Sequence, residues 1–164
     1  GDLTDNYNPR EHTLNLSDKV YGSRSIAAIG VAAHECGHAI QHARHYVPLT
    51  VRSAIIPAAN IGSSFAWPLV LIGLIIPRLN FCMTIGILLF SLVVILQLVT
   101  LPVEFNASRR AIQIIRDSGY LAPDELKGAK SVLKAAAMTY VAAMVSVSLQ
   151  LLRLVILRNS RDDN

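Results

Sequence analysis

Two long stretches without a charged residue constrain the fold of this chain more than any other feature of its sequence. They run from Ala54 to Ile76 and from Phe81 to Leu101, separated by the short segment Pro77-Arg78-Leu79-Asn80. A helix of about 20 apolar residues crosses the hydrocarbon core of a bilayer. The two stretches therefore predict a transmembrane helical hairpin, kinked where Pro57 and Pro68 interrupt its first span. A pair of buried core helices is the alternative, and the lack of polar faces disfavours it.

A third apolar stretch, Ala135 to Leu157, contains a single charged residue, Arg153, close enough to its end to reach the headgroup layer. Charged residues make up 16% of the chain, against about 25% in soluble domains. We therefore predict a mostly α-helical, membrane-embedded protein with a C-terminal transmembrane helix. The net charge of +4 is not gathered into a stripe, and no aromatic platform accompanies it, which excludes typical nucleic-acid-binding surfaces.

The segment from Ser25 to His45 is predicted to be a helix, because it is rich in small and apolar residues and contains no proline. Within it, His34 and His38 are four residues apart and share one face. Two imidazoles held in this way can bind one zinc ion. Glu35 points to the side of the metal, where its carboxylate can accept a proton from water without binding the metal. Two incidental histidines on a surface helix are the alternative.

A third protein ligand is usual in a hydrolytic zinc site. The metzincin pattern places a third histidine ten residues after the first, but Arg44 occupies that position. His42 lies too far along the helix to bind together with His34, and His45 is out of register. Both are expected to support the site or to lie on the surface, which leaves Glu104 as the better candidate.

Glu104 stands in the first turn of a helix that we predict from Pro102 to Ser118, with Gly119 ending it. Small residues on the stripe of Glu104 would let this helix pack closely against the histidine helix: Ala107, Ser108 and Ala111. Close packing would bring the carboxylate to the metal. A glutamate placed there only by the helix dipole is the alternative.

These residues resemble the gluzincin-type integral-membrane zinc metallopeptidases. Within that group the chain is most similar to the YugP-like neutral zinc metallopeptidases, on the stretches AAHECGHAIQHA, LPVEFNASRRA and TYVAAMVSVSLQLLRL. The resemblance covers nearly all of the chain. It implies a membrane-embedded, zincin-like helical fold, with zinc on His34, His38 and Glu104 and with Glu35 as base. The wider gluzincin pattern often has an aspartate where this chain has Ser108, so the partner that orients the histidines stays open.

The distribution of basic residues gives an orientation. Eleven of the fifteen lysines and arginines lie before residue 54 or between residues 103 and 134. Two crossings return the chain to its starting side, so the histidines and Glu104 share one side, and the positive-inside rule predicts that this side faces the cytoplasm. We expect an integral protein of a bacterial plasma membrane. Because the chain begins with Gly1 and not with Met, we also expect a fragment or processed product, and the resemblance implies an upstream anchor.

Residues 3–16 are predicted to form a hairpin with a turn at Asn8-Pro9, either as a docking edge for an extended peptide or as a stabilising element. We expect residues 17–25 to be a connector in which Ser23 or Ser25 caps the next helix. The chain should turn at residues 47–49, and residues 158–164 should be frayed. We treat residues 1–164 as one unit built from four segments: 1–53, 54–101, 102–134 and 135–157.

The function predicted from these residues is zinc-dependent hydrolysis of peptide bonds in protein substrates at the membrane surface. Arg109, Tyr7 and Tyr140 are candidate donors to the transition-state oxyanion. An intramembrane zinc protease is the first alternative, and the short apolar lead from Ile26 to Ala33 argues against it. A non-catalytic metal-binding membrane scaffold is the second, and the presence of Glu35 argues against that. The sequence leaves the oligomeric state open.

Overall fold

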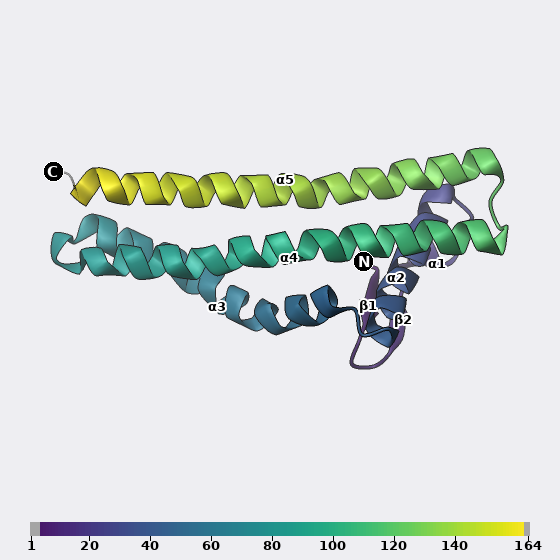
Figure 1. Cartoon of the computed structure of the whole chain (residues 1–164), viewed down its shortest axis with the longest axis horizontal. Helices are drawn as coiled ribbons and strands as arrows, with labels where there is room; N and C mark the ends of the chain where they lie inside the picture. Colours follow the sequence, from purple (N-terminus) through teal and green to yellow (C-terminus); the bar gives the residue numbers. More distant parts are fainter. Residues whose placement is uncertain (1–3, 163–164) are drawn as a thin grey trace. The chain divides into compact units, whose positions relative to one another are not determined.

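The computed structural model describes residues 4–162, and most of them are helical (Figure 1). The elements follow one another as β1 (Asn6–Asn8), β2 (Thr13–Asn15), α1 (Asp18–Tyr21), α2 (Ile26–Ala43), α3 (Val47–Ile75), the 3-10 helix η1 (Pro77–Leu79), α4 (Asn80–Ser118) and α5 (Pro123–Asp162). Three of the helices, α3, α4 and α5, are long and apolar enough to cross a membrane. The predicted helical fold, with a small N-terminal sheet and three candidate spans, is confirmed.

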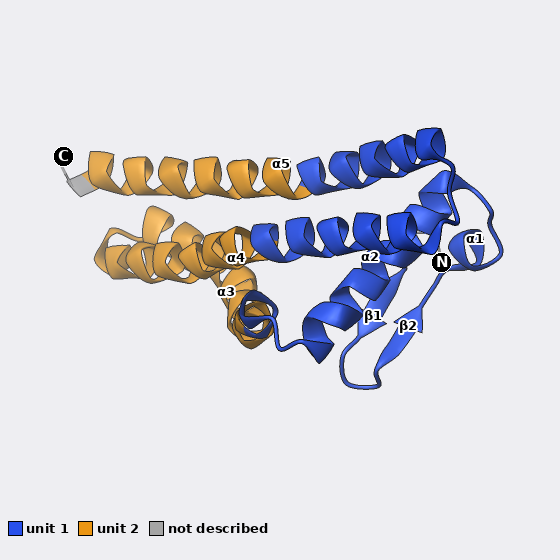
Figure 2. Ribbon diagram, turned by 45° about the vertical axis from the view of Figure 1, so that its right-hand side comes forward, with its two compact units in different colours: residues 1–50, 101–139 blue, residues 51–100, 140–164 orange. Residues whose placement is uncertain are grey.

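The chain forms two compact units, coloured separately in Figure 2. Unit 1 contains residues 4–50 and 101–139 of the described chain, and unit 2 contains residues 51–100 and 140–162. Helices α4 and α5 each contribute to both units. Every residue predicted for the metal site lies in unit 1.

Unit 1 has a small core in which α2, α4 and α5 meet. Its buried members are mostly small: Ala33, Ala111, Ile115, Ala129 and Leu133. Gly37 allows the closest approach, because a Cβ atom at this position would lie 2.5 Å from the backbone oxygen of Ala107. Helices α2 and α4 are therefore in backbone contact at the level of the candidate site.

The N-terminal hairpin packs against α2 in the same unit. Strands β1 and β2 are antiparallel, with Tyr7 opposite Leu14, so the predicted hairpin is present, although Leu3 lies outside the described residues. Ser17 fixes the base of the hairpin through its backbone N–H and hydroxyl, which donate to the Asp5 carboxylate at 2.7 and 3.2 Å. Ser25 is the cap of α2, as its hydroxyl accepts from the backbone N–H of Ala28 at 3.2 Å.

Unit 2 is held together by close contact between α3 and α4. A Cβ atom on Gly62 would lie 2.7 Å from the backbone oxygen of Leu89, and one on Gly73 would lie 2.5 Å from the backbone nitrogen of Met83. Small residues permit this approach in membrane helices, where packing rather than hydrophobic burial drives association. The outer faces carry many exposed large apolar side chains, among them Leu88 and Leu98 on α4, as expected of surfaces that meet lipid.

Two predicted boundaries in the first half of the chain were wrong. The connector over residues 17–25 contains the short helix α1. The turn expected at residues 47–49 falls instead at residues 44–46, where His45 has a φ of 51°. Pro48 then occupies the first turn of α3, where its missing N–H leaves no bond unmade.

Two later boundaries were also wrong. The helix expected to begin at Pro102 is the continuation of α4, which contains Pro102 in its interior. A proline inside a helix costs about 3 kcal/mol, because one backbone hydrogen bond is lost and the ring clashes with the preceding turn. The packing of buried residues after the proline, such as Val103 and Ala107, outweighs this cost. The tail expected to fray over residues 158–164 is helical through Asp162, because Arg161 donates to the carbonyl oxygens of Gly73 and Leu74 at 2.8 and 2.9 Å. Residues 163–164 lie outside the described residues.

Candidate metal centre

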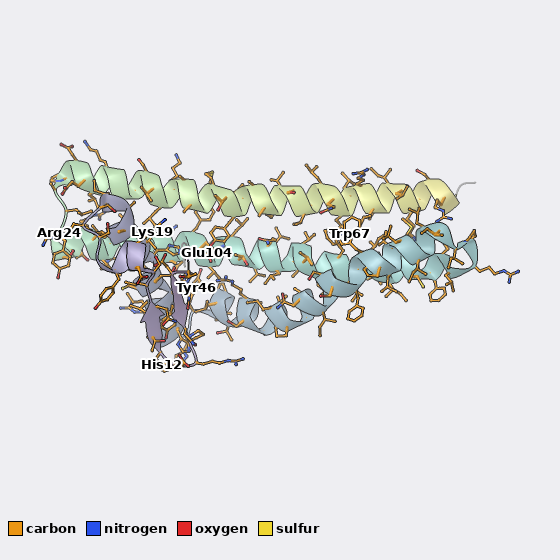
Figure 3. The ribbon with its side chains drawn as sticks, turned by 180° about the vertical axis from the view of Figure 1, so that it is seen from behind. His12, Lys19, Arg24, Tyr46, Trp67 and Glu104 are labelled. Carbon is orange, nitrogen blue, oxygen red and sulfur yellow. The ribbon has the colours of Figure 1, made fainter. Side chains whose placement is uncertain are left out.

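Three side chains from two helices converge in unit 1. His34 Nε2 and His38 Nε2 on α2 lie 3.0 and 3.6 Å from Glu104 Oε2. Glu104, on α4, is labelled in Figure 3. One ligand atom of each residue lies within 4.8 Å of the others. Among the described residues this is the one group of three or more His, Cys, Asp or Glu side chains that could hold a metal ion. Glu104 is only 2% exposed, so its carboxylate is committed to this cluster.

Gln41 orients His38. The Gln41 side chain is fully buried, and its amide nitrogen donates to the backbone oxygen of Val103 at 2.8 Å and to Asn106 Oδ1 at 3.0 Å. Because both acceptors face the amide nitrogen, the amide oxygen must face His38 Nδ1, 2.9 Å away. In the neutral imidazole, His38 Nδ1 therefore carries the hydrogen and Nε2 keeps the lone pair that a metal ion can bind, whereas in the protonated ring Nε2–H donates to the Glu104 carboxylate.

His34 has a partner of its own on α4. Its Nδ1 lies 3.1 Å from the hydroxyl of Ser108, one helical turn after Glu104. A hydroxyl can accept from the imidazole and so favours the tautomer in which Nε2 is free. Both histidines thus use Nδ1 for a fixed protein partner and present Nε2 to Glu104, the arrangement typical of metal-binding histidines.

Glu35 lies beside the cluster without belonging to it. Burial raises the pKa of the Glu35 carboxyl above its ordinary value, more than the charges of His38 and His34 lower it. The backbone N–H of Tyr7 on β1 donates to this carboxylate. A glutamate with a raised pKa is a better proton acceptor than an exposed one, because its basicity lies closer to neutral pH.

The cluster stabilises a positive charge on His38. Burial by itself would lower the pKa of His38. The hydrogen bond and the negative charge of Glu104, together with Gln41 and Glu35, outweigh burial and raise this pKa. Burial and the neighbouring Glu35 raise the pKa of the Cys36 thiol, so its sulfur stays protonated and is a poor metal ligand.

His42 and His45 lie outside the proposed ligand set, as their spacing from His34 predicts. His42 Nδ1 lies 2.9 Å from the Tyr7 hydroxyl, and its ring packs edge-on against His12 with centroids 5.2 Å apart. His42 and His45 are not part of the three-residue cluster. Among the candidate oxyanion donors, Tyr7 lies next to Glu35, whereas Arg109 lines a different cavity and Tyr140 belongs to unit 2.

Sequence reasoning missed Gln41, the residue that fixes the His38 tautomer. The signal was present: Gln41 follows His38 by three residues and His34 by seven, so a polar side chain continues the histidine face along α2. From the sequence alone, a glutamine near the end of a helix is expected to be exposed, because polar residues at such positions usually are.

Comparison with known proteins identifies the family. Residues 1–159 match the family model described as "Putative neutral zinc metallopeptidase". This chain belongs to that family. It is 49% identical over 165 residues to the "Putative membrane protease YugP" of Bacillus subtilis (strain 168), an alignment that covers the whole chain and 73% of the relative. No solved structure matches the chain. Membership of a zinc metallopeptidase family implies zinc, and the three candidate spans and the likeness to a membrane protease support a membrane protein.

Proposed function

We propose that this protein is a zinc-dependent endopeptidase of the gluzincin type, which hydrolyses peptide bonds of protein substrates at the membrane surface. The observation that carries the proposal is the convergence of His34, His38 and Glu104, with the buried carboxylate of Glu35 beside them. Membership of the zinc metallopeptidase family supports it.

The donor set fits zinc. Two imidazole nitrogens and one carboxylate oxygen are the usual protein ligands of a hydrolytic zinc ion, and both imidazoles have the Nδ1 partners that such ligands require. We assign His34, His38 and Glu104 as the ligands. Zinc bound there would polarise the scissile carbonyl and make a water molecule more acidic.

Glu35 has the proton-transfer role in this proposal. It accepts the proton of the attacking water and delivers it to the leaving amine. Its raised pKa suits both steps, because it must bind the proton and then release it. The Tyr7 backbone N–H donates to this carboxylate, which restrains the Glu35 side chain.

We place the site at the cytoplasmic surface of a bacterial plasma membrane. Helix α2 is not among the helices of residues 4–162 that could span a bilayer, which favours a surface site over an intramembrane one. The cytoplasmic assignment follows from the eleven basic residues that share its side of the predicted topology.

Glu35→Gln tests the proposed role of the base. The amide keeps the shape of the side chain but cannot accept the proton, so we expect hydrolysis of a protein substrate to fall by about 10²-fold or more. Bound zinc, measured by elemental analysis of the purified protein, should be unchanged. Wild-type turnover in Glu35→Gln would show that Glu35 is not the proton acceptor. A non-catalytic scaffold predicts no metal-dependent turnover even in the wild type.

Glu104→Gln tests the third ligand. A neutral amide is a weak zinc ligand, so zinc affinity and turnover should fall together. Asp124→Asn is the matched control, because Asp124 is an exposed carboxylate paired only with Lys127, and it should change neither. Zinc X-ray absorption that showed three histidine ligands would mean that the third ligand is wrongly assigned.

A further inference from the structure

Unit 1 contains a cavity that the proposed peptidase site does not use. It has a volume of about 370 Å³ and is lined by Arg109, Ile112, Gln113, Arg116 and Asp117 of α4 and by Lys130 of α5. At about 100° per residue, Arg109, Gln113 and Arg116 lie about 120–180° around α4 from Glu104. The cavity therefore opens on the face of α4 opposite to the candidate metal ligands.

The charge of this cavity is unbalanced. Three cationic side chains line it, and Asp117 is its one anionic residue. Within residues 4–162, the side chains of Arg109, Arg116 and Lys130 make no hydrogen bond or ion pair. The neighbouring Arg110, by contrast, donates to Asn106 at 2.8 Å. The three cations that line the cavity are available to an external anion.

The chemistry of the lining suits a phosphate group. A guanidinium presents paired donors that match two phosphate oxygens, and an ammonium adds a compact charge. Gln113 supplies a neutral donor, and Ile112 supplies an apolar surface for a carbon substituent. The volume lies in the range of small-ligand sites, so the cavity can hold a phosphate with its attached organic group.

Two of the three cations lie near the ends of the apolar stretches, whereas Arg116 lies about 22 Å of helix rise beyond Leu101. Arg109 follows Leu101 by eight residues and Lys130 precedes Ala135 by five, or about 12 and 8 Å of helix rise. The headgroup layer occupies roughly 5–8 Å beyond the hydrocarbon on each side of a bilayer. Long basic side chains at these positions can reach the phosphates of lipids in the adjoining leaflet.

We infer that this cavity binds a phosphate-bearing anion, and that its natural occupant is the headgroup of an anionic membrane lipid. The inference depends on the cavity and on the membrane spans, and it holds whether or not the protein hydrolyses peptides. Binding at this face of α4 would anchor the juxtamembrane part of unit 1 to the leaflet.

The test measures ligand-induced thermal stabilisation of the purified full-length protein in a neutral detergent. Phosphatidylglycerol at about 100 times its Kd should raise the Tm by roughly 5–10 °C, while phosphatidylcholine should not. Inorganic phosphate is a separate arm. A shift with phosphatidylglycerol alone assigns the site to lipid, and an equal shift with inorganic phosphate assigns it to a free phosphate compound.

Charge-reversed variants locate the effect. Arg116→Glu and Lys130→Glu should each abolish the Tm shift, whereas Arg24→Glu, which changes the net charge equally outside the cavity, should retain it. If a reversed variant fails to fold, Arg116→Gln and Lys130→Gln should each raise the apparent Kd by about tenfold. A full shift in all cavity variants, or no shift with either phosphate compound in the wild type, overturns the inference.

Discussion

At the scale of single residues, the candidate metal centre depends on side chains that are not themselves proposed metal ligands. Gln41 is fully buried and joins His38 to α4 through Val103 and Asn106. It therefore sets the tautomer of a proposed ligand and links the two helices that supply the ligands. A single amide therefore orients one proposed ligand and ties its helix to the helix that carries Glu104.

Gln41→Leu should weaken zinc binding by about 10–100-fold, because His38 loses the acceptor that keeps its Nε2 unprotonated. It should also lower the free energy of unfolding by about 1–3 kcal/mol, since buried polar partners are left unsatisfied. Competition with a zinc chelator and denaturant titration measure the two effects. Gln150→Leu makes the same change at an exposed position of α5 and should alter neither; equal losses in both variants would contradict the assigned role.

The hydrogen bond between Tyr7 and His42 should contribute to the position of β1 against α2. We expect Tyr7→Phe and His42→Phe each to lower the free energy of unfolding by about 0.5–1.5 kcal/mol. Since the two side chains share one bond of 2.9 Å, the double variant should lose less than the sum. A double-mutant cycle measures this coupling, and strict additivity would show that the bond does not stabilise the hairpin.

At the scale of elements, the contact between α2 and α4 sets the geometry of the cluster. Both helices are fixed in the same way, by small residues that face each other: Ala33 and Gly37 on α2 and Ala107 and Ala111 on α4. A larger side chain in this contact between α2 and α4 must push the two helices apart. The distance between the Nε2 atoms and Glu104 would then increase as well.

Gly37→Ala should therefore destabilise unit 1 by about 1–3 kcal/mol and weaken zinc binding. The new Cβ atom would meet the backbone oxygen of Ala107 at 2.5 Å, and a backbone atom cannot move aside alone. Gly30→Ala on the same helix is the control. Its Cβ atom would meet Leu133 at an ordinary 3.9 Å, so it should be neutral or stabilise α2 by up to about 1 kcal/mol. Thermal unfolding and zinc titration of both variants make the comparison.

At the scale of the whole molecule, the order of the spans decides which segments share a side of the membrane. The predicted topology puts the α4–α5 connection on the side of the proposed active site and η1 on the other. Tyr120 is 83% exposed in that connection, and Arg78 is exposed in η1. Each offers a position for a labelled cysteine that disturbs little packing.

We expect Tyr120→Cys and Arg78→Cys, in a chain whose Cys36 and Cys82 are replaced by alanine, to react from opposite sides. An impermeant thiol reagent should label Arg78→Cys in intact cells and Tyr120→Cys only in inside-out vesicles. Labelling of both cysteines from one side would refute the two-span hairpin. If Tyr120→Cys reacted in intact cells and Arg78→Cys only in inside-out vesicles, the hairpin would stand. The proposed active site would then face the side opposite to the cytoplasm.

The helical membrane class, the small N-terminal hairpin and the pair of candidate histidine ligands follow from the sequence alone. The reason is that each depends on a short-range property: the length of an uncharged run, the alternation of residues 12–16, or the spacing of His34 and His38 on one helix turn. Element ends were less predictable. Pro102 should end a helix by local rules, but packing after it keeps α4 continuous.

The support of the candidate site, by contrast, depends on contacts between residues that are far apart in the sequence. The partner of His34 is Ser108, 74 residues away, and Gln41 reaches Val103 and Asn106 across more than 60 residues. Such contacts depend on the distance between α2 and α4, which the backbone contact at Gly37 sets. The cavity between α4 and α5 is of the same kind, because helical spacing groups Arg109, Arg116 and Gln113 on one face, and only packing brings Lys130 to them.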